Sequence, residues 1–218
     1  MAAKKYQHII WDWNGTLLDD AWLCVEVMNA VLGRREMPLL TSEKYREVFD
    51  FPVKEYYRRL GFDFARESFE VSGTEFIVGY EKRRHEARLR LDAKRTLAAV
   101  AELGITQSLL SAYKQETLDE LTQDLGVRQF FLKVIGQDNH YAHGKTESGK
   151  RWINEMHCGA HEVLLVGDTV HDHEVAEAIG ADCVLIPAGH HNREKLETCG
   201  VPVLDLLPDV VGFLTGEV

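Results

Sequence analysis

Short apolar segments that end at a polar residue or a glycine constrain the fold of this chain most strongly. They cover residues 8–11 before Asp12, residues 105–110 before Ser111, and residues 163–166 before Gly167. Helical patterns lie at about residues 93–103, 115–125, 146–157, 171–179 and 206–214. Buried strands that alternate with helices are typical of a parallel sheet that helices cover on both faces. We therefore predict an α/β fold, to which residues 134–135 and 182–186 contribute further strands.

This alternation stops between about residues 20 and 88, where the pattern is helical throughout. An insertion directly after the first strand lies near the carboxyl edge of the sheet, which is where open α/β sheets bind their ligands. We therefore predict a helical cap over that edge. The predicted division places the cap at residues 20–88 and the core at residues 1–19 and 89–218.

The segment after the first predicted strand reads Asp-Trp-Asn-Gly-Thr from Asp12 to Thr16. Residues two apart on a strand point the same way, so Asp12 and Asn14 are expected to face one site. Gly15 permits a turn that leaves backbone N–H groups available to an anion. An ordinary turn after a strand, with Asp12 as a cap, is the competing explanation when this segment is taken alone.

A second acidic motif, Gly-Asp-Thr-Val-His-Asp, runs from Gly167 to Asp172 between a predicted strand and a predicted helix. Its spacing places Asp168 and Asp172 on one side of the same loop. Carboxylates that meet in a crevice repel one another unless a hard cation neutralises them, and Mg²⁺ prefers oxygen ligands. For an isolated motif of this kind, two acids that interact favourably with the helix dipole are the more common explanation.

A hydroxyl group and a lysine complete the set. Ser111 can donate a hydrogen bond to a phosphoryl oxygen, although a helix N-cap is its more common role. Lys145 can supply positive charge to a nucleophile and a phosphoryl group, although most lysines are simply exposed, and Lys150 competes for the same role. Each signal is weak alone, but their order along the chain favours a common site.

Composition excludes several other classes of protein. The formal net charge of −10 argues against binding to nucleic acid, because that affinity depends largely on Lys and Arg. No signal peptide fits the N-terminus, and no stretch approaches the ~18 apolar residues of a membrane span. The four cysteines lack a CxxC pair, which favours free thiols. We expect a cytoplasmic monomer or homodimer with no membrane or nucleic-acid partner.

Taken in order, these motifs resemble those of the haloacid dehalogenase superfamily over essentially the whole chain. The DxDGT motif of that family resembles Asp12 to Thr16, its Ser/Thr and lysine motifs resemble Ser111 and Lys145, and its GDxxxD motif resembles Asp168 to Asp172. The helical insertion is similar to the helical cap of the family. Within the superfamily, the chain is most similar to the phosphoglycolate phosphatase-like branch.

This resemblance implies a Rossmann-like core and a hydrolase that acts on a small phosphorylated metabolite. Asp12 would attack phosphorus and form an aspartyl-phosphate. Mg²⁺ would be held by Asp12, the backbone carbonyl of Asn14, and Asp168, with Asp172 in a supporting position. The residues implied in phosphate binding are Gly15, Thr16, Ser111 and Lys145.

Asn14 departs from the family pattern, which has a second aspartate at this position. That aspartate protonates the leaving oxygen and later activates water, whereas an amide has no titratable proton to give. Because general acid–base catalysis contributes about 10²–10⁴-fold, we expect slow turnover of alkyl phosphates and faster turnover of acyl or aryl phosphates. The alternative is that a residue of the cap or a histidine supplies the proton.

Other interpretations of the same residues remain open at this point. A dehalogenase or a phosphonate-cleaving enzyme on the same core, with Lys54 as the lysine of the latter, is one alternative. A non-catalytic phosphate-binding protein is another. For all ten histidines we favour ordinary polar roles, and cationic residues of the insertion could bind a substrate carboxylate: Arg34, Arg35, Lys54, Arg58 and Arg59.

Overall fold

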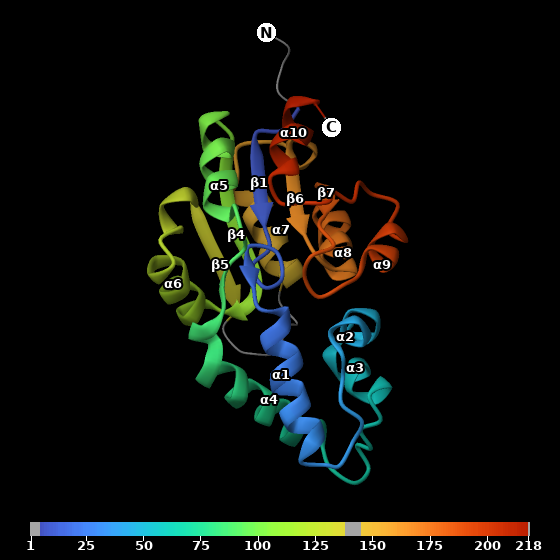
Figure 1. Cartoon of the computed structure of the whole chain (residues 1–218). Helices are drawn as coiled ribbons and strands as arrows, with labels where there is room; N and C mark the ends of the chain where they lie inside the picture. The colour runs from blue at the N-terminus through green and yellow to red at the C-terminus, as the bar shows by residue number, and fades with distance from the viewer. Residues whose placement is uncertain (1–4, 138–144, 218) are drawn as a thin grey trace.

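The computed structural model describes residues 5–137 and 145–217, and its centre is a five-stranded parallel sheet (Figure 1). The strands lie in the order β5-β4-β1-β6-β7, and every neighbouring pair is parallel. Their bounds are β1 His8–Trp11, β4 Thr106–Lys114, β5 Lys133–Gln137, β6 Val163–Gly167 and β7 Asp182–Leu185. The predicted α/β fold is therefore confirmed.

Alternating side chains of the central strands supply an apolar core on each face of the sheet. Ile9 and Trp11 of β1 belong to one buried cluster, whereas Ile10 belongs to another. The first cluster packs against α5 (Ala93–Glu102), α6 (Gln115–Asp124) and α10 (Asp209–Thr215). The second packs against α7 (Lys145–Glu155), α8 (Val170–Ile179) and α9 (Arg193–Glu197). Helices thus cover both faces, as continuous apolar strands require.

Three local features differ from the sequence prediction. Strand β4 runs on to Lys114, with a shift of register between Leu110 and Lys114, so Ser111 lies inside the strand. Lys114 is the N-cap of α6, and an N-cap role for Ser111 is therefore wrong. Helix α10 begins three residues later than residue 206, after Pro208 at its N-cap. Short 3-10 helices also occur, η2 at Arg128–Phe130 and η3 at Ala160–Glu162.

Four inserted helices lie beyond the carboxyl ends of the strands (Figure 1). They are α1 Ala21–Gly33, α2 Ser42–Val48, α3 Val53–Arg59 and α4 Phe69–Arg83, and the 3-10 helix η1 Arg84–Glu86 follows them. Their apolar side chains form a third buried cluster, separate from the two that flank the sheet. Antiparallel pairing of β2 (Leu18–Asp19) with β3 (Arg88–Leu89) joins the start of the insertion to its end. Within the described ranges, no helix is both long and apolar enough to cross a membrane.

Candidate active site

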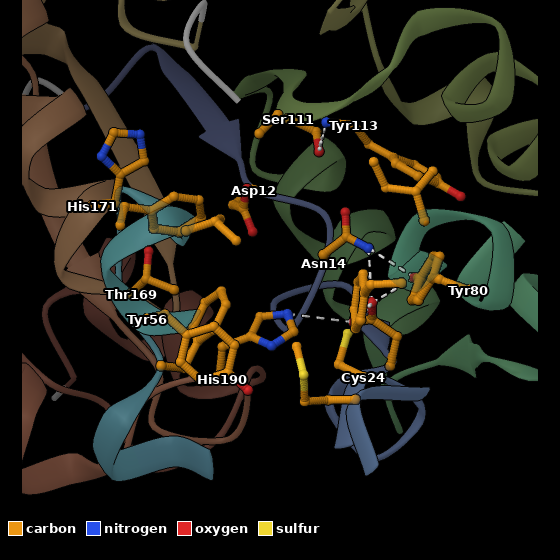
Figure 2. A pocket seen from close by; sticks show the side chains of 18 of the residues that line it. Asp12, Asn14, Cys24, Tyr56, Tyr80, Ser111, Tyr113, Thr169, His171 and His190 are labelled. Carbon is orange, nitrogen blue, oxygen red and sulfur yellow. Dashed lines mark hydrogen bonds and ion pairs between the residues drawn. The ribbon is translucent and has the colours of Figure 1, made fainter. Parts of the chain in front are cut away.

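A cavity of about 210 Å³ separates the carboxyl edge of the sheet from the inserted helices (Figure 2). Asp12 follows β1 directly, and its backbone N–H donates to the Val166 carbonyl at 2.9 Å, which fixes it beside β6. Its carboxylate borders the cavity together with Ser111, Lys145 and Asp172. The sheet therefore brings residues from four separate segments of the sequence to one place.

Lys145 links two of the acidic residues. Lys145 is the first residue of α7, and its side chain is buried, with 3% of its surface exposed. Its Nζ donates to Asp12 Oδ1 and to Asp172 Oδ1, each at 2.5 Å. Lys150 instead pairs with Glu147 at 2.9 Å on the surface. Of the two candidate lysines, only Lys145 lies beside Asp12.

The three carboxylates of the two acidic motifs meet behind this lysine. Oxygen atoms of Asp12, Asp168 and Asp172 all lie within 4.8 Å of one another. Burial and the charge of Asp172 raise the pKa of Asp12 to about 8, against the opposing effect of Lys145, and raise the pKa of Asp168 to about 7. Burial acts on Asp172 in the same direction, but Lys145 holds the pKa of Asp172 below its usual value. Concentrated carboxylates of this kind fit a hard divalent cation.

Asp172 also performs the helix-start role that was the alternative explanation for it. Its Oδ2 accepts from the Thr169 backbone N–H at 3.0 Å and the Thr169 hydroxyl at 2.6 Å, which makes it part of a capping box at the start of α8. Its Oδ1 faces Lys145. Capping and the contact with the lysine use different oxygens, so the two roles are compatible.

Gly15 and Thr16 shape the loop after β1 and are not among the residues that line the cavity, and the phosphate-binding role expected for them stays a prediction. The Gly15 N–H donates to Asp20 Oδ1 at 2.8 Å, and the Thr16 N–H donates to the Trp13 carbonyl at 3.2 Å. The Thr16 hydroxyl donates to Asp168 Oδ1 at 2.8 Å. At position 15, where φ is +78°, a Cβ atom would lie 2.3 Å from Asp168 Oδ2, so the close approach of Asp168 requires glycine.

Ser111 borders the cavity from within β4. Its Oγ accepts a hydrogen bond from the Tyr113 backbone N–H at 3.1 Å, and the side chain is almost fully buried. A hydroxyl that accepts from the backbone still has its own proton to donate. The register shift after Leu110 thus leaves a hydroxyl donor at the edge of the cavity.

Asn14 forms a hydrogen-bonded group with two residues that the sequence did not single out. Its Nδ2 donates to Asp20 Oδ2 at 2.8 Å and to the Tyr80 hydroxyl at 3.1 Å, and Tyr80 in turn donates to Asp20 Oδ2 at 2.6 Å. Figure 2 shows the amide nitrogen on the side of Tyr80 and the carbonyl oxygen turned away from it. Asp20 is fully buried and stands where the α/β core meets the insertion. No motif marks Asp20, because its role depends on side chains distant in the sequence.

Comparison with known proteins places this arrangement in a family. A family model described as haloacid dehalogenase-like hydrolase matches residues 9–186. This chain is a haloacid dehalogenase-like hydrolase. The matched range contains Asp12, Ser111, Lys145 and both acids of the second motif.

Individual relatives of this hydrolase are distant. A phosphoglycolate phosphatase from Aliivibrio fischeri is 27% identical over 121 residues, which cover 55% of the chain and half of the relative's length. A second phosphoglycolate phosphatase, from Pseudomonas savastanoi pv. phaseolicola, is 24% identical over 96% of the chain and 80% of the relative. A haloacid dehalogenase-like hydrolase from Streptococcus pneumoniae has the same fold, with a TM-score of 0.83 at 14% identity over 97% and 99% of the two chains.

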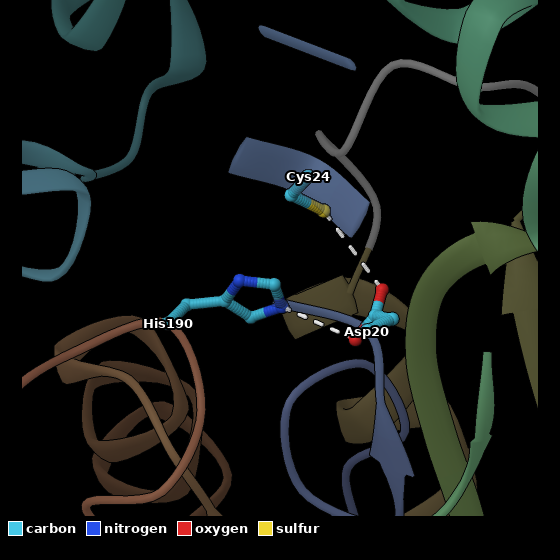
Figure 3. Close-up of side chains that lie close together, drawn as sticks. All are labelled: Asp20, Cys24 and His190. Carbon is cyan, nitrogen blue, oxygen red and sulfur yellow. Dashed lines mark hydrogen bonds and ion pairs between the residues drawn. The ribbon is translucent and has the colours of Figure 1, made fainter. Parts of the chain in front are cut away.

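A second group of polar side chains also lines this cavity, and Figure 3 shows its members, His190, Asp20 and Cys24, close together. His190 is a loop histidine, as expected, but it is buried. Its Nδ1 lies 2.8 Å from the Tyr45 hydroxyl and its Nε2 lies 3.7 Å from Asp20 Oδ1. Cys24 Sγ lies 3.9 Å from Asp20 Oδ2, and burial raises the pKa of this thiol. Asp20, Cys24 and His190 have atoms close enough to share a metal, but Asp20 already accepts three shorter hydrogen bonds and Cys24 is held as a neutral thiol.

The cationic residues that we considered for substrate binding are engaged elsewhere in this hydrolase. None of the five lines the cavity that contains Asp12. Four form ion pairs, namely Arg34 with Glu75, Arg35 with Glu67 and Glu75, Arg58 with Glu55, and Arg59 with Asp50. The fifth, Lys54, packs over the rings of Phe64 and Phe69. Lys54 also lines a second cavity, which shares Lys145, Phe51 and Phe76 with the cavity that contains Asp12. A phosphonate-cleaving enzyme that uses this lysine stays an untested alternative.

Proposed function

We propose that this hydrolase cleaves small phosphate monoesters in the presence of Mg²⁺, with Asp12 as the covalent nucleophile. The observation that carries the proposal is the position of Asp12, which lies at the cavity wall between Lys145 and the acids of the second motif. The distant phosphoglycolate phosphatases support the same class of reaction. We further propose that residues 20–88 act as the cap of this site.

The reaction would proceed by two displacements at phosphorus. In the first, an Asp12 carboxylate oxygen bonds to phosphorus while the ester P–O bond breaks and its electron pair leaves on the alcohol oxygen. In the second, water attacks phosphorus, the bond to Asp12 breaks, and inorganic phosphate departs as the water proton passes to solvent. Ser111 and Lys145 would donate hydrogen bonds to the phosphoryl oxygens.

The described residues fit a magnesium ion. The ion would be held by Asp12, Asp168 and the backbone carbonyl of Asn14. Asp172 would keep Lys145 and the loop in position. Bound Mg²⁺ supplies positive charge that shields the nucleophile from the anionic phosphate. The test of the proposal is phosphate release from a panel of phosphate esters with Mg²⁺ or with a chelator. Release that is independent of Mg²⁺, or absent throughout the panel, would contradict it.

Mg²⁺ is expected to bind more tightly as the pH rises from about 6 to about 8.5. The pKa values of Asp12 and Asp168 are about 8 and about 7, whereas the pKa of an unfolded carboxyl is ~4. The folded protein is therefore more stable when these two carboxyl groups carry their protons. This contribution to stability is present below pH ~4 and is lost as the pH rises through 7 to 8, when Mg²⁺ can replace the protons. The increase in Tm caused by Mg²⁺, measured at both ends of the range, should be larger at the alkaline end. An equal increase at both ends would argue against these carboxylates as ligands.

A burst of p-nitrophenol, equal in amount to the enzyme, is expected when p-nitrophenyl phosphate is mixed with the protein. This leaving group departs without a proton donor, so the first displacement is fast. The second displacement is slow because Asn14 cannot take a proton from water. Rapid-quench measurements should also find the phosphoryl group on Asp12 by peptide mass spectrometry. Linear release from the first turnover, with no labelled peptide, would show that the covalent intermediate does not accumulate.

A further inference from the structure

We infer that the substrate is an aryl phosphate, the phosphate ester of a phenol with an uncharged ring, rather than a phosphorylated acid or sugar. This inference rests on the proposed function and names the substrate class of the same site. Three features of the cavity carry it: its apolar wall, the absence of a free lysine or arginine among its described lining residues, and the orientation of the Asn14 amide.

The wall that faces the leaving group is aromatic and aliphatic. Half-buried side chains from the inserted helices and from β4 line the cavity, namely Phe49, Phe51, Phe76, Ile77 and Tyr113. The buried ring of Tyr56 packs edge to face against Tyr45 and Phe49, and the buried ring of Tyr45 stacks on Phe49. An apolar ring that enters this wall is removed from water, and each aromatic contact adds to the favourable free energy of transfer. A hydroxylated sugar would lose several hydrogen bonds to water, and this wall offers few in return, because the Tyr113 hydroxyl already donates to Glu81 and the Tyr56 hydroxyl is a single buried group.

Charge in the cavity disfavours a second anionic group on the substrate. Among the described lining residues, Lys145 is the one lysine or arginine, and Asp12 and Asp172 already contact its ammonium group. Asp20 and Glu81 also line the cavity and present negative charge. A carboxylate beyond the phosphate, as in phosphoglycolate, would be desolvated without a cationic partner.

The Asn14 amide restricts the leaving group. Both of its N–H groups have acceptors, in Asp20 and in the Tyr80 hydroxyl, so neither is available to the leaving oxygen. A leaving oxygen that gains no proton from residue 14 departs most readily as a stable anion. Phenols ionise with a pKa of about 10, as tyrosine does, whereas water ionises only at a much higher pKa. A phenol meets both requirements, because it leaves as a stable anion without a proton from Asn14 and its ring packs against the apolar wall.

Four substrates separate these requirements. Phenyl phosphate has the ring and the good leaving group, 2-phenylethyl phosphate has only the ring, acetyl phosphate has only the leaving group, and phosphoglycolate has neither. With Mg²⁺ present, kcat/KM for phenyl phosphate should exceed each of the other three values at least tenfold. Phosphoglycolate or acetyl phosphate turned over as efficiently as phenyl phosphate would overturn the inference and leave the proposed function intact. No phosphate release from any of the four would remove the proposed function as well.

Substitution of one wall residue provides a second test, in which the protein is changed and the substrate is kept the same. Phe76→Ala should lower kcat/KM for phenyl phosphate about tenfold or more and should raise KM more than it changes kcat, because the ring loses a binding contact. Val78 lies on the same helix, but its side chain is 63% exposed, so Val78→Ala is the matched control with unchanged kinetics. Equal kinetics for the two variants, with equal Tm values, would contradict a binding role for this wall.

Discussion

Asp12→Asn is expected to abolish phosphate release, with a loss in kcat of at least about a thousandfold. An amide is a far weaker nucleophile than a carboxylate and cannot form the acyl phosphate, and removal of a covalent nucleophile costs factors of this size or more. The loss should be the same for every substrate, because all of them pass through the same intermediate. The measurement is Mg²⁺-dependent phosphate release together with a search for labelled Asp12 peptide after acid quench.

The expected loss arises from chemistry and not from unfolding, and two measurements separate these causes. Burial raises the pKa of Asp12 to about 8, so the site accepts a neutral group at this position at neutral pH, and the Tm of Asp12→Asn should not fall. Asp19 is an exposed acid at the end of β2, and Asp19→Asn should retain full activity. Residual activity of Asp12→Asn above a few per cent of wild type would exclude Asp12 as the nucleophile.

The sequence predicted the parallel sheet and the meeting of its motifs because both depend on local patterns. Apolar runs such as His8–Trp11 are short and end at a polar residue or a glycine, and this combination indicates buried strands. Parallel strands all end at the same edge, so residues such as Asp12 and Asp168, which follow β1 and β6, come together there. In contrast, α2 and α3 have seven residues each, which is too short for a helical period to be visible, and were not predicted individually.

The part of the site around Asn14 could not be predicted because Tyr80 and His190 reach Asn14 and Asp20 from distant segments of the chain. Asp20, Tyr80 and His190 come from three distant segments, and each is unremarkable within its own segment. Ser111 was placed correctly at the cavity, but the polar residues after it concealed the continuation of β4 to Lys114. Gly15 and Thr16 were expected to bind phosphate, and only the structure shows that Asp20, Asp168 and the loop itself accept their hydrogen bonds.

These contacts change the design of an experiment that the sequence alone suggests, which is restoration of the missing acid by Asn14→Asp. In that variant, a carboxyl oxygen would lie about as close to Asp20 Oδ2 as the 2.8 Å of the present amide nitrogen. Two carboxylates at such a distance cannot both be ionised, so they would share a proton. We expect the single variant to have a lowered Tm at alkaline pH and an activity that falls as this proton is lost.

The paired exchange Asn14→Asp with Asp20→Asn is expected to raise kcat/KM for 2-phenylethyl phosphate by about 10²–10⁴-fold, the usual contribution of a general acid–base. The exchange reverses the hydrogen bond between the two side chains and preserves the net charge, and the new amide can still accept from the Gly15 N–H. Phenyl phosphate should gain much less in kcat/KM, because its leaving oxygen needs no proton. Asp20→Asn alone is the control, since it removes a charge without adding an acid beside the cavity. A paired variant that folds and binds Mg²⁺ but shows no selective gain for the alkyl ester would show that the identity of residue 14 does not limit this enzyme. That result would also remove the argument that Asn14 restricts the leaving group to a phenol.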